Sequence, residues 1–81
     1  MTDSAIAARI VNALEAAADR EAGQKTALVS VTIDMLKSAD AGAIDARLTR
    51  KTRSLVFMAA EFRTDAGERI ATASSVHKLQ S

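Results

Sequence analysis

The first part of the chain has the spacing of hydrophobic residues that an amphipathic helix requires. At about 100° per residue, three of them fall on one face: Ile6, Ile10 and Leu14. Alanine, the strongest helix former, fills many of the positions between them. Asp3 or Ser4 can accept backbone N–H bonds at the start, and Gly23 favours the left-handed conformation that ends helices. The pattern predicts a helix over 4–21.

The rest of the chain alternates between hydrophobic and polar residues with the period of two that is typical of strands. No proline interrupts these stretches, and TDAGE at 64–68 has the Asp and Gly order of a hairpin turn. The pattern predicts four strands, at 26–37, 42–50, 53–64 and 69–79. A helix followed by four antiparallel strands is an α+β arrangement, and we expect residues 1–81 to form a single domain with the sheet wrapped against the helix.

Three strands differ in their side-chain pattern. SLVFMAAEF at 54–62 is apolar on both faces, which indicates a central strand that is covered on both sides. AIDARLTRK at 43–51 alternates with charged residues, as suits an edge strand. SVTIDMLK at 30–37 has one apolar face, whereas its second face carries an acid between two other side chains: Thr32, Asp34 and Leu36.

Length and composition indicate how a chain of this size can be stabilised. A domain of 81 residues buries only about 60% of the surface of its unfolded chain, so it is marginal alone. The chain has no cysteine and one histidine, which excludes disulfides and argues against a metal site built on thiolates or imidazoles. We therefore expect a homodimer or a higher homo-oligomer, with no metal.

Charge and hydropathy argue against two further classes of partner. The net charge is +1 and the only aromatic residues are two phenylalanines, which disfavours nucleic-acid binding. No apolar run approaches the roughly 18 residues that span a bilayer. The first residues also lack the basic and apolar segments of a secretory signal, so we expect a cytoplasmic protein.

Four short motifs follow one another along the predicted strands: TIDMLK at 32–37, RKTR at 50–53, SLVFMAAEF at 54–62 and DAGERIA at 65–71. In order and spacing they resemble the hotdog-fold thioesterases of the phenylacetate-degradation type, in which glycine is usual at the position of Thr52. The resemblance covers about residues 5–79. It implies a hotdog fold, in which one N-terminal helix is wrapped by a four-stranded antiparallel sheet with the strand order 42–50, 53–64, 69–79, 26–37.

The resemblance implies a thioesterase-like protein that binds acyl-CoA or a related acyl thioester at a dimer interface. The family usually begins with a further strand and a His-Gly-Gly loop, whose backbone N–H groups polarise the thioester carbonyl, and this sequence shows neither. Counting back from Thr32 places Asn12 where the family has its helix acid. An amide cannot take up a proton, so we predict Glu15, one turn later, as the catalytic base and Asn12 as a substrate-binding residue. A solvated helix face explains both residues equally simply.

The remaining site predictions also follow from the resemblance. Arg50, Lys51 and Arg53 are predicted to bind the phosphates of coenzyme A, which enters as substrate or ligand and not as a cofactor. Their simpler interpretation is an edge hairpin that charge keeps soluble. Three residues are predicted at the dimer interface: Thr32, Asp34 and Leu36. We interpret His77 as an ordinary surface or interface histidine, because no nucleophile is marked beside it.

Two alternatives stay open. The chain can be a catalytically degenerate hotdog domain that acts as a structural or partner-binding module, with a partner strand added at the 42–50 edge. It can also be one part of a heteromeric thioesterase in which another chain supplies the absent loop.

Overall fold

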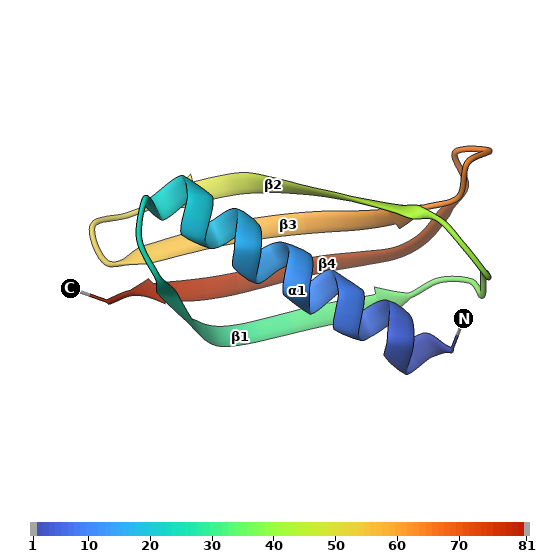
Figure 1. The fold of residues 1–81 in the computed structure, drawn as a ribbon, viewed down its shortest axis with the longest axis horizontal. Helices are drawn as coiled ribbons and strands as arrows, with labels where there is room; N and C mark the ends of the chain where they lie inside the picture. Colours follow the sequence, from blue (N-terminus) through green and yellow to red (C-terminus); the bar gives the residue numbers. More distant parts are fainter. Residues whose placement is uncertain (1, 81) are drawn as a thin grey trace.

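In the computed structural model, which describes residues 2–80, one helix lies against one four-stranded antiparallel sheet (Figure 1). The elements are α1 (Asp3–Ala22), β1 (Thr26–Met35), β2 (Ala43–Lys51), β3 (Leu55–Arg63) and β4 (Arg69–Leu79). The strand order is β1-β4-β3-β2, and each neighbouring pair is antiparallel. The predicted α+β fold and strand order are confirmed.

The two ends of α1 are capped by side-chain and backbone hydrogen bonds. Thr2 is the N-cap, since its hydroxyl accepts the N–H of Ala5 at 3.2 Å. The prediction of Asp3 or Ser4 as the cap was therefore wrong by one or two residues. Gly23 ends the helix as predicted, with φ of 69° and its N–H bonded to the carbonyl of Asp19 at 2.9 Å.

Two strand ends differ from the predicted bounds by two residues, for local reasons, and the other strand ends agree with the prediction to within one residue. β1 stops at Met35 because the N–H groups of Leu36 and Lys37 both bond to the carbonyl of Ile70, which turns the chain out of the ladder. β3 starts at Leu55 because the preceding residues form a tight turn. In that turn the N–H of Thr52 bonds to the carbonyl of Leu55, and the N–H of Leu55 bonds to the Thr52 hydroxyl.

The hydrophobic core lies between α1 and the sheet. The largest fully buried side chains in it are Ile6, Ile10, Leu14, Val56, Met58, Phe62 and Ile70. Val31, Ile33 and Met35 pack at its margin, so the apolar face predicted for β1 does turn towards the helix. The many alanines of α1 include Ala17 and Ala18, whose small side chains are buried against the strands.

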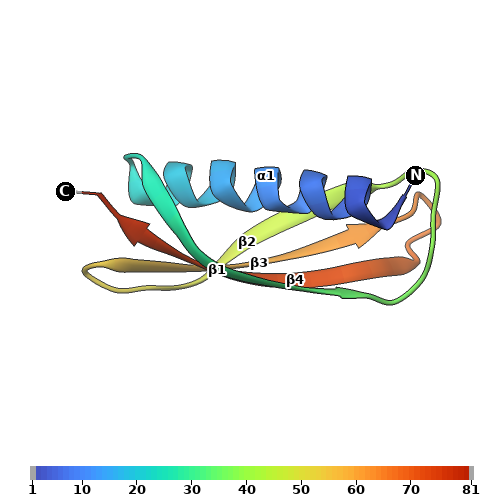
Figure 2. The same cartoon turned by 90° about the horizontal axis from the view of Figure 1, so that it is seen from below.

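The prediction that the central strand is covered on both sides was wrong for the described chain. β3 lies between β4 and β2 as expected, and every second residue from Val56 to Phe62 is buried beneath α1. The alternate residues Leu55, Phe57 and Ala59 are only half-buried. Figure 2 shows the reason, because α1 runs along one side of the sheet and no element of residues 2–80 covers the other side. We call this other side the outer face.

Candidate functional site

Asn12 and Glu15 lie where the helical pattern placed them. Both side chains are exposed on α1, one turn apart, and neither contributes to the core. Neither residue lines the hollow on the sheet that is described below. In a single chain they therefore form an open polar surface, and their predicted roles remain predictions.

Asp19 continues this polar side of α1 by one further turn and was missed by the sequence analysis. Its Oδ1 accepts the backbone N–H of Thr26 at 2.8 Å and the Thr26 hydroxyl at 2.6 Å. These hydrogen bonds lower the pKa of Asp19, because they favour its charged form. The carboxylate thus ties the end of α1 to the start of β1. The sequence did carry a signal for this contact, because Asp19 lies near the end of the helix, shortly before Gly23 and Thr26.

His77 lies under the helix and not at the surface, so that interpretation was wrong. It sits on β4 opposite Val56 of β3 and Leu28 of β1, with its side chain on the helix-facing side and 0% exposed. Its Nε2 is 2.7 Å from the buried hydroxyl of Ser75. The spacing of two along β4 puts both residues on one face, which the alternating pattern of that strand could have indicated.

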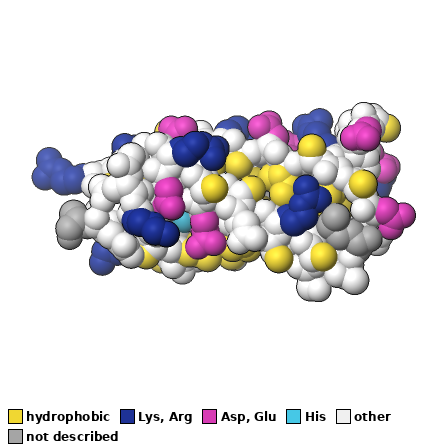
Figure 3. All heavy atoms as spheres, viewed as in Figure 1, with side chains coloured by type: hydrophobic (Ala, Val, Ile, Leu, Met, Phe, Trp, Pro, Cys, Tyr) yellow, Lys and Arg dark blue, Asp and Glu magenta, His cyan; other side chains and the backbone are white. Residues whose placement is uncertain are grey.

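The environment of His77 combines burial with nearby acids. Burial lowers the pKa of His77, and the charges of Glu15 and Asp19 act in the opposite direction. Figure 3 shows acidic side chains on either side of the histidine in the view from the helix side. The histidine is therefore held mainly as a neutral ring beneath an acidic part of α1.

The three basic residues of the β2–β3 hairpin are exposed but do not point in one direction. A bulge at Thr49 shifts the register, after which Arg50 pairs with Phe57 on the outer face and Lys51 pairs with Val56 on the helix side. Lys51 Nζ bonds to the carbonyl of Glu21 at 3.2 Å. The hairpin is thus brought to the C-terminal end of α1, about 14 Å along the helix from Asn12 at the ordinary helical rise.

The predicted interface residues lie on or just after an edge strand. β1 is at one edge of the sheet, where Thr32 and Asp34 are exposed on the outer face. Leu36 is 53% exposed, and Val29, the extra residue in a bulge of the same strand, is 58% exposed. This edge therefore presents apolar side chains beside its unpaired backbone groups.

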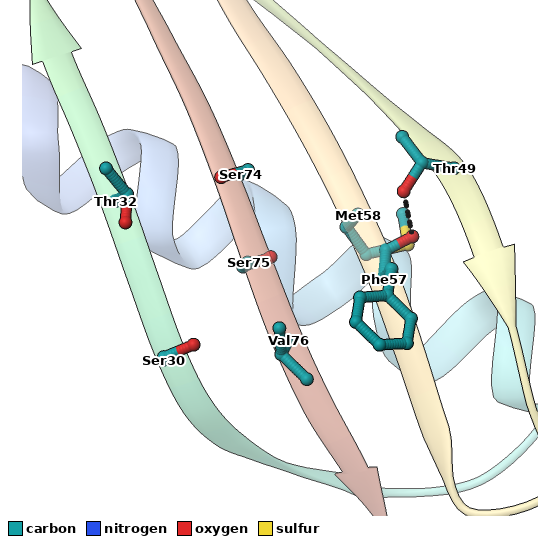
Figure 4. Close-up of a pocket in the computed structure, with 8 residues that line it drawn as sticks. All are labelled: Ser30, Thr32, Thr49, Phe57, Met58, Ser74, Ser75 and Val76. Carbon is teal, nitrogen blue, oxygen red and sulfur yellow. Dashed lines mark hydrogen bonds between the residues drawn. The ribbon is translucent and has the colours of Figure 1, made fainter.

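A shallow hollow of about 140 Å³ lies on the outer face, on the side away from α1 (Figure 4). Its lining residues come from all four strands: Ser30, Thr32, Thr49, Phe57, Met58, Ser74, Ser75 and Val76. In the close-up, Ser30 and Thr32 lie on one side of β4 and Phe57 on the other. The sequence analysis named Thr32 of this set but did not predict the hollow, since the hydroxyl residues come together only across strands.

On the same outer face, the carboxylate of Glu61 lies near three arginines. Glu61 contacts Arg63 at 2.6 Å, and Arg47 and Arg69 each at 3.7 Å. The hydrogen bond from Arg63 lowers the pKa of Glu61, and the positive charges add to the effect. The negative charge of Glu61 thus offsets part of the positive charge of these arginines, which come from three neighbouring strands. Within residues 2–80, no group of three His, Cys, Asp or Glu side chains is arranged to hold a metal ion.

The described helix does not combine the length and apolar character that would allow it to cross a membrane.

No protein-family model and no curated protein matches the sequence. Solved structures do match the fold. A Bacillus halodurans protein solved with CoA superposes with a TM-score of 0.86 at 16% identity, over 96% of this chain and 58% of its own. A protein from the thioesterase superfamily gives 0.85 at 12% identity, over 99% and 62%. A phenylacetic acid degradation-related protein from Ralstonia eutropha JMP134 gives 0.62 at 27% identity, over 70% and 44%.

The chain thus spans less than two thirds of the length of each of these proteins. The similarity covers the helix and the strands together, since almost the whole chain is included in the first two of these superpositions. The molecule has the hotdog fold of thioesterase-superfamily proteins, as its sequence motifs predicted.

Proposed function

We propose that the protein binds acyl-CoA or a related acyl thioester at the interface of a homodimer and hydrolyses it. The support is the fold shared with thioesterase-superfamily proteins, one of which was solved with CoA. The observation that carries the dimer part is the exposure of Asn12 and Glu15 on α1, which leaves them open to an opposite wall. A second copy supplies such a wall and offsets the small core of one chain.

The chemistry assigned to this site uses two side chains of α1. The Asn12 amide donates a hydrogen bond to the thioester carbonyl oxygen and orients it. Water attacks the carbonyl carbon while Glu15 takes up its proton, the C–S bond breaks, and the thiolate of CoA is protonated as it leaves. Glu15 is exposed, so water reaches it without a movement of the fold.

The test of the catalytic role is hydrolysis of acyl-CoA substrates by Glu15→Gln, with Glu21→Gln as the matched control on the same helix. A positioned general base contributes about 10²- to 10⁴-fold, so the first variant is expected to lose at least tenfold in turnover while the control keeps its rate. Asn12→Asp places an acid at the position where the resembling family has one and is expected to increase the rate. Unchanged turnover in Glu15→Gln rejects Glu15 as the base.

The phosphate-binding role of the hairpin is tested separately by calorimetry with CoA. Arg50→Gln and Arg53→Gln are each expected to weaken binding several-fold, because each removes one charge-assisted contact to a phosphate. Lys37→Gln, at the other end of the sheet, is the control. Because Arg50 and Lys51 face opposite sides of the sheet, a comparison of Arg50→Gln with Lys51→Gln adds a test of direction. A loss of affinity in only one of these two variants would show which face the phosphates meet.

The dimer itself is tested by analytical ultracentrifugation. Leu36→Glu places a charge on an exposed apolar position of the β1 edge, and we expect it to shift the protein towards monomer. Asp34→Asn keeps the shape of the side chain and tests the contribution of its charge to the predicted interface. A wild-type protein that stays monomeric at high micromolar concentration contradicts the proposal.

A second candidate is a module that receives a partner strand at β2 and performs no chemistry. The observation in its favour is that β2 is an edge of the described sheet, with Ala43–Leu48 paired regularly to β3 alone. The bulge at Thr49 and the exposed Arg47 limit such pairing to the first part of the strand. Binding of a CoA ester, measured by calorimetry on the isolated chain, would favour the first proposal over this one.

A further inference from the structure

The single histidine of the chain lies where the C-terminal half of α1 rests on the sheet. His77 is fully buried on the helix-facing side of β4, among Leu28 of β1, Val56 of β3 and the helix above. Leu14, Ala17 and Ala18 of this half of α1 are buried against the same side of the sheet. The imidazole is thus part of the packing that supports the helix.

The hydrogen bonding of the ring suits its neutral form. Nε2 is 2.7 Å from the Ser75 hydroxyl, whereas Nδ1 has no hydrogen-bond partner in the part of the chain that the structure describes. At Nδ1, a buried N–H without an acceptor would cost more than a buried lone pair without a donor. We therefore assign the neutral tautomer that carries its proton on Nε2 and a lone pair on Nδ1. Protonation would create an N–H at Nδ1 with no acceptor in place.

The charged groups around the ring do not relieve this deficit. From α1, Glu15 and Asp19 act on the histidine electrostatically, but Asp19 Oδ1 already accepts two hydrogen bonds from Thr26. The paired residues on β1 and β3, Leu28 and Val56, do not titrate. On β2, Lys51 is the cation on the helix side, and it bonds to the carbonyl of Glu21.

We propose that His77 is an acid-sensitive support for α1, whose protonation loosens the C-terminal half of the helix from the sheet. This inference stands on the burial of the ring and on the missing acceptor at Nδ1, and it is independent of whether the protein binds a thioester. In the acid form, the ring either draws the Glu15 carboxylate inward or leaves the core. Both responses displace the part of α1 that follows Leu14.

The sign of the pH dependence follows from burial. Because burial lowers the pKa of His77 in the folded protein below its ordinary value of 6.5, the unfolded chain binds the proton first as pH falls. The contribution of the neutral ring to stability is therefore fully present above pH 6.5, and it is lost as pH falls from 6.5 through the lower folded pKa. One proton changes the unfolding equilibrium by at most about tenfold per pH unit.

The experiment is urea unfolding of the full chain at pH 7.5, 6.5 and 5.5. The equilibrium constant of unfolding is expected to rise several-fold, and at most about tenfold, between pH 6.5 and 5.5. His77→Phe, which fills the site with an apolar ring, and His77→Gln are expected to show a much smaller slope over the same range. A wild-type stability that is flat over this range, or an unchanged slope in a folded variant, would overturn the proposal.

Two measurements on the wild type keep the test decisive if both variants fail to fold. An NMR titration of the one histidine should give a folded-state pKa below 6.5, and a value at or above 6.5 rejects the proposal. Hydrogen exchange, corrected for the intrinsic effect of pH, should show faster opening at pH 5.5 for residues 15–22 than for residues 6–13. Equal protection of the two halves of α1 at both pH values also rejects it.

Discussion

The two faces of the sheet carry similar numbers of apolar residues along β3 but have different environments. On the helix side, Val56, Met58 and Phe62 are fully buried against α1. On the outer face, Leu55 and Phe57 are half-buried beside a shallow hollow with several hydroxyl groups. The alternation of one strand therefore places apolar side chains on both faces, while the chain itself covers only one of them.

This difference shows how many of the apolar side chains of the sheet a single helix can bury. A single helix of 20 residues covers one side of a four-stranded sheet, and no other element of residues 2–80 lies on the other side. The outer face instead carries charged and hydroxyl residues around its apolar centre, including Glu61 with its three arginines. The helix side supplies the stability of the single chain, and the outer face contributes less to it.

The largest expected effect comes from the only two aromatic residues, which lie on opposite faces of β3. Phe62→Ala removes a fully buried ring that packs against the core and under the Arg9 guanidinium, 5.3 Å from the ring centre. It is expected to cost about 3–5 kcal/mol. Phe57→Ala on the half-buried outer face should cost about 1–2 kcal/mol. Urea unfolding of both variants measures the difference.

The same pair of variants can contradict the comparison. Equal losses for Phe57→Ala and Phe62→Ala would mean that the outer face is covered in solution. In that case the loss for Phe57→Ala would depend on protein concentration, because a second molecule would bury the ring. A loss that is small and independent of concentration supports an outer face that is open in the single chain.

The next effect concerns the close approach of the chain before β2 to the end of β3. A Cβ added at Gly42 would lie 2.7 Å from Cε1 of Phe62 and would collide with the carbonyl oxygen of Arg63. Because that oxygen belongs to the backbone, Gly42→Ala is expected to cost about 1–3 kcal/mol. Ala41→Ser, at the exposed preceding position, is the control and should change stability by less than about 0.5 kcal/mol. A Gly42→Ala protein as stable as the control would show that this edge of the core yields easily.

The smallest expected effects on stability come from replacing the two acids whose pKa is lowered. Asp19→Asn and Glu61→Gln both remove a carboxylate that is favoured in the folded state, so each is expected to reduce stability at pH 7. The contribution of each acid is present above its ordinary pKa, 3.8 or 4.5, and is lost as pH falls through its lower folded value. Unfolding measured between pH 7 and pH 3 checks this sign.

Added salt should distinguish the ion pairs of Glu61 from the hydrogen bonds of Asp19. At 1 M NaCl the screening length is about 3 Å, which should remove more than half of the Glu61 effect because that effect depends on exposed arginines. The Asp19 effect should persist, since it depends on two hydrogen bonds to Thr26. An Asp19 effect that vanishes with salt would show that these hydrogen bonds contribute little.

The elements and their order could be predicted because they depend on local pattern and on short motifs. Ile6, Ile10 and Leu14 define the buried face of α1, and Val31, Ile33 and Met35 turn towards the core as their alternation indicated. The strand order came from the resemblance, since periodicity alone does not say which strands are neighbours. The positions of Asn12, Glu15 and the hairpin residues at the surface also agree with the pattern, although no observation tests their roles.

Features that need two distant segments could not be predicted in this way. The burial of His77 depends on α1 lying over β4, and the split of Arg50 and Lys51 between faces depends on a bulge that only strand pairing reveals. The Asp19–Thr26 contact is more local, since its residues are seven apart, but it also depends on the angle at which the chain leaves the helix.

By itself, the sequence determined one amphipathic helix, four strands and the absence of disulfides, because these depend on residue type and spacing along the chain. Only the tertiary structure decided which face of the sheet is covered, what surrounds the histidine and where the hollow forms. The physical reason is that burial is a property of the layer opposite a residue, and that layer comes from parts of the chain far away in sequence.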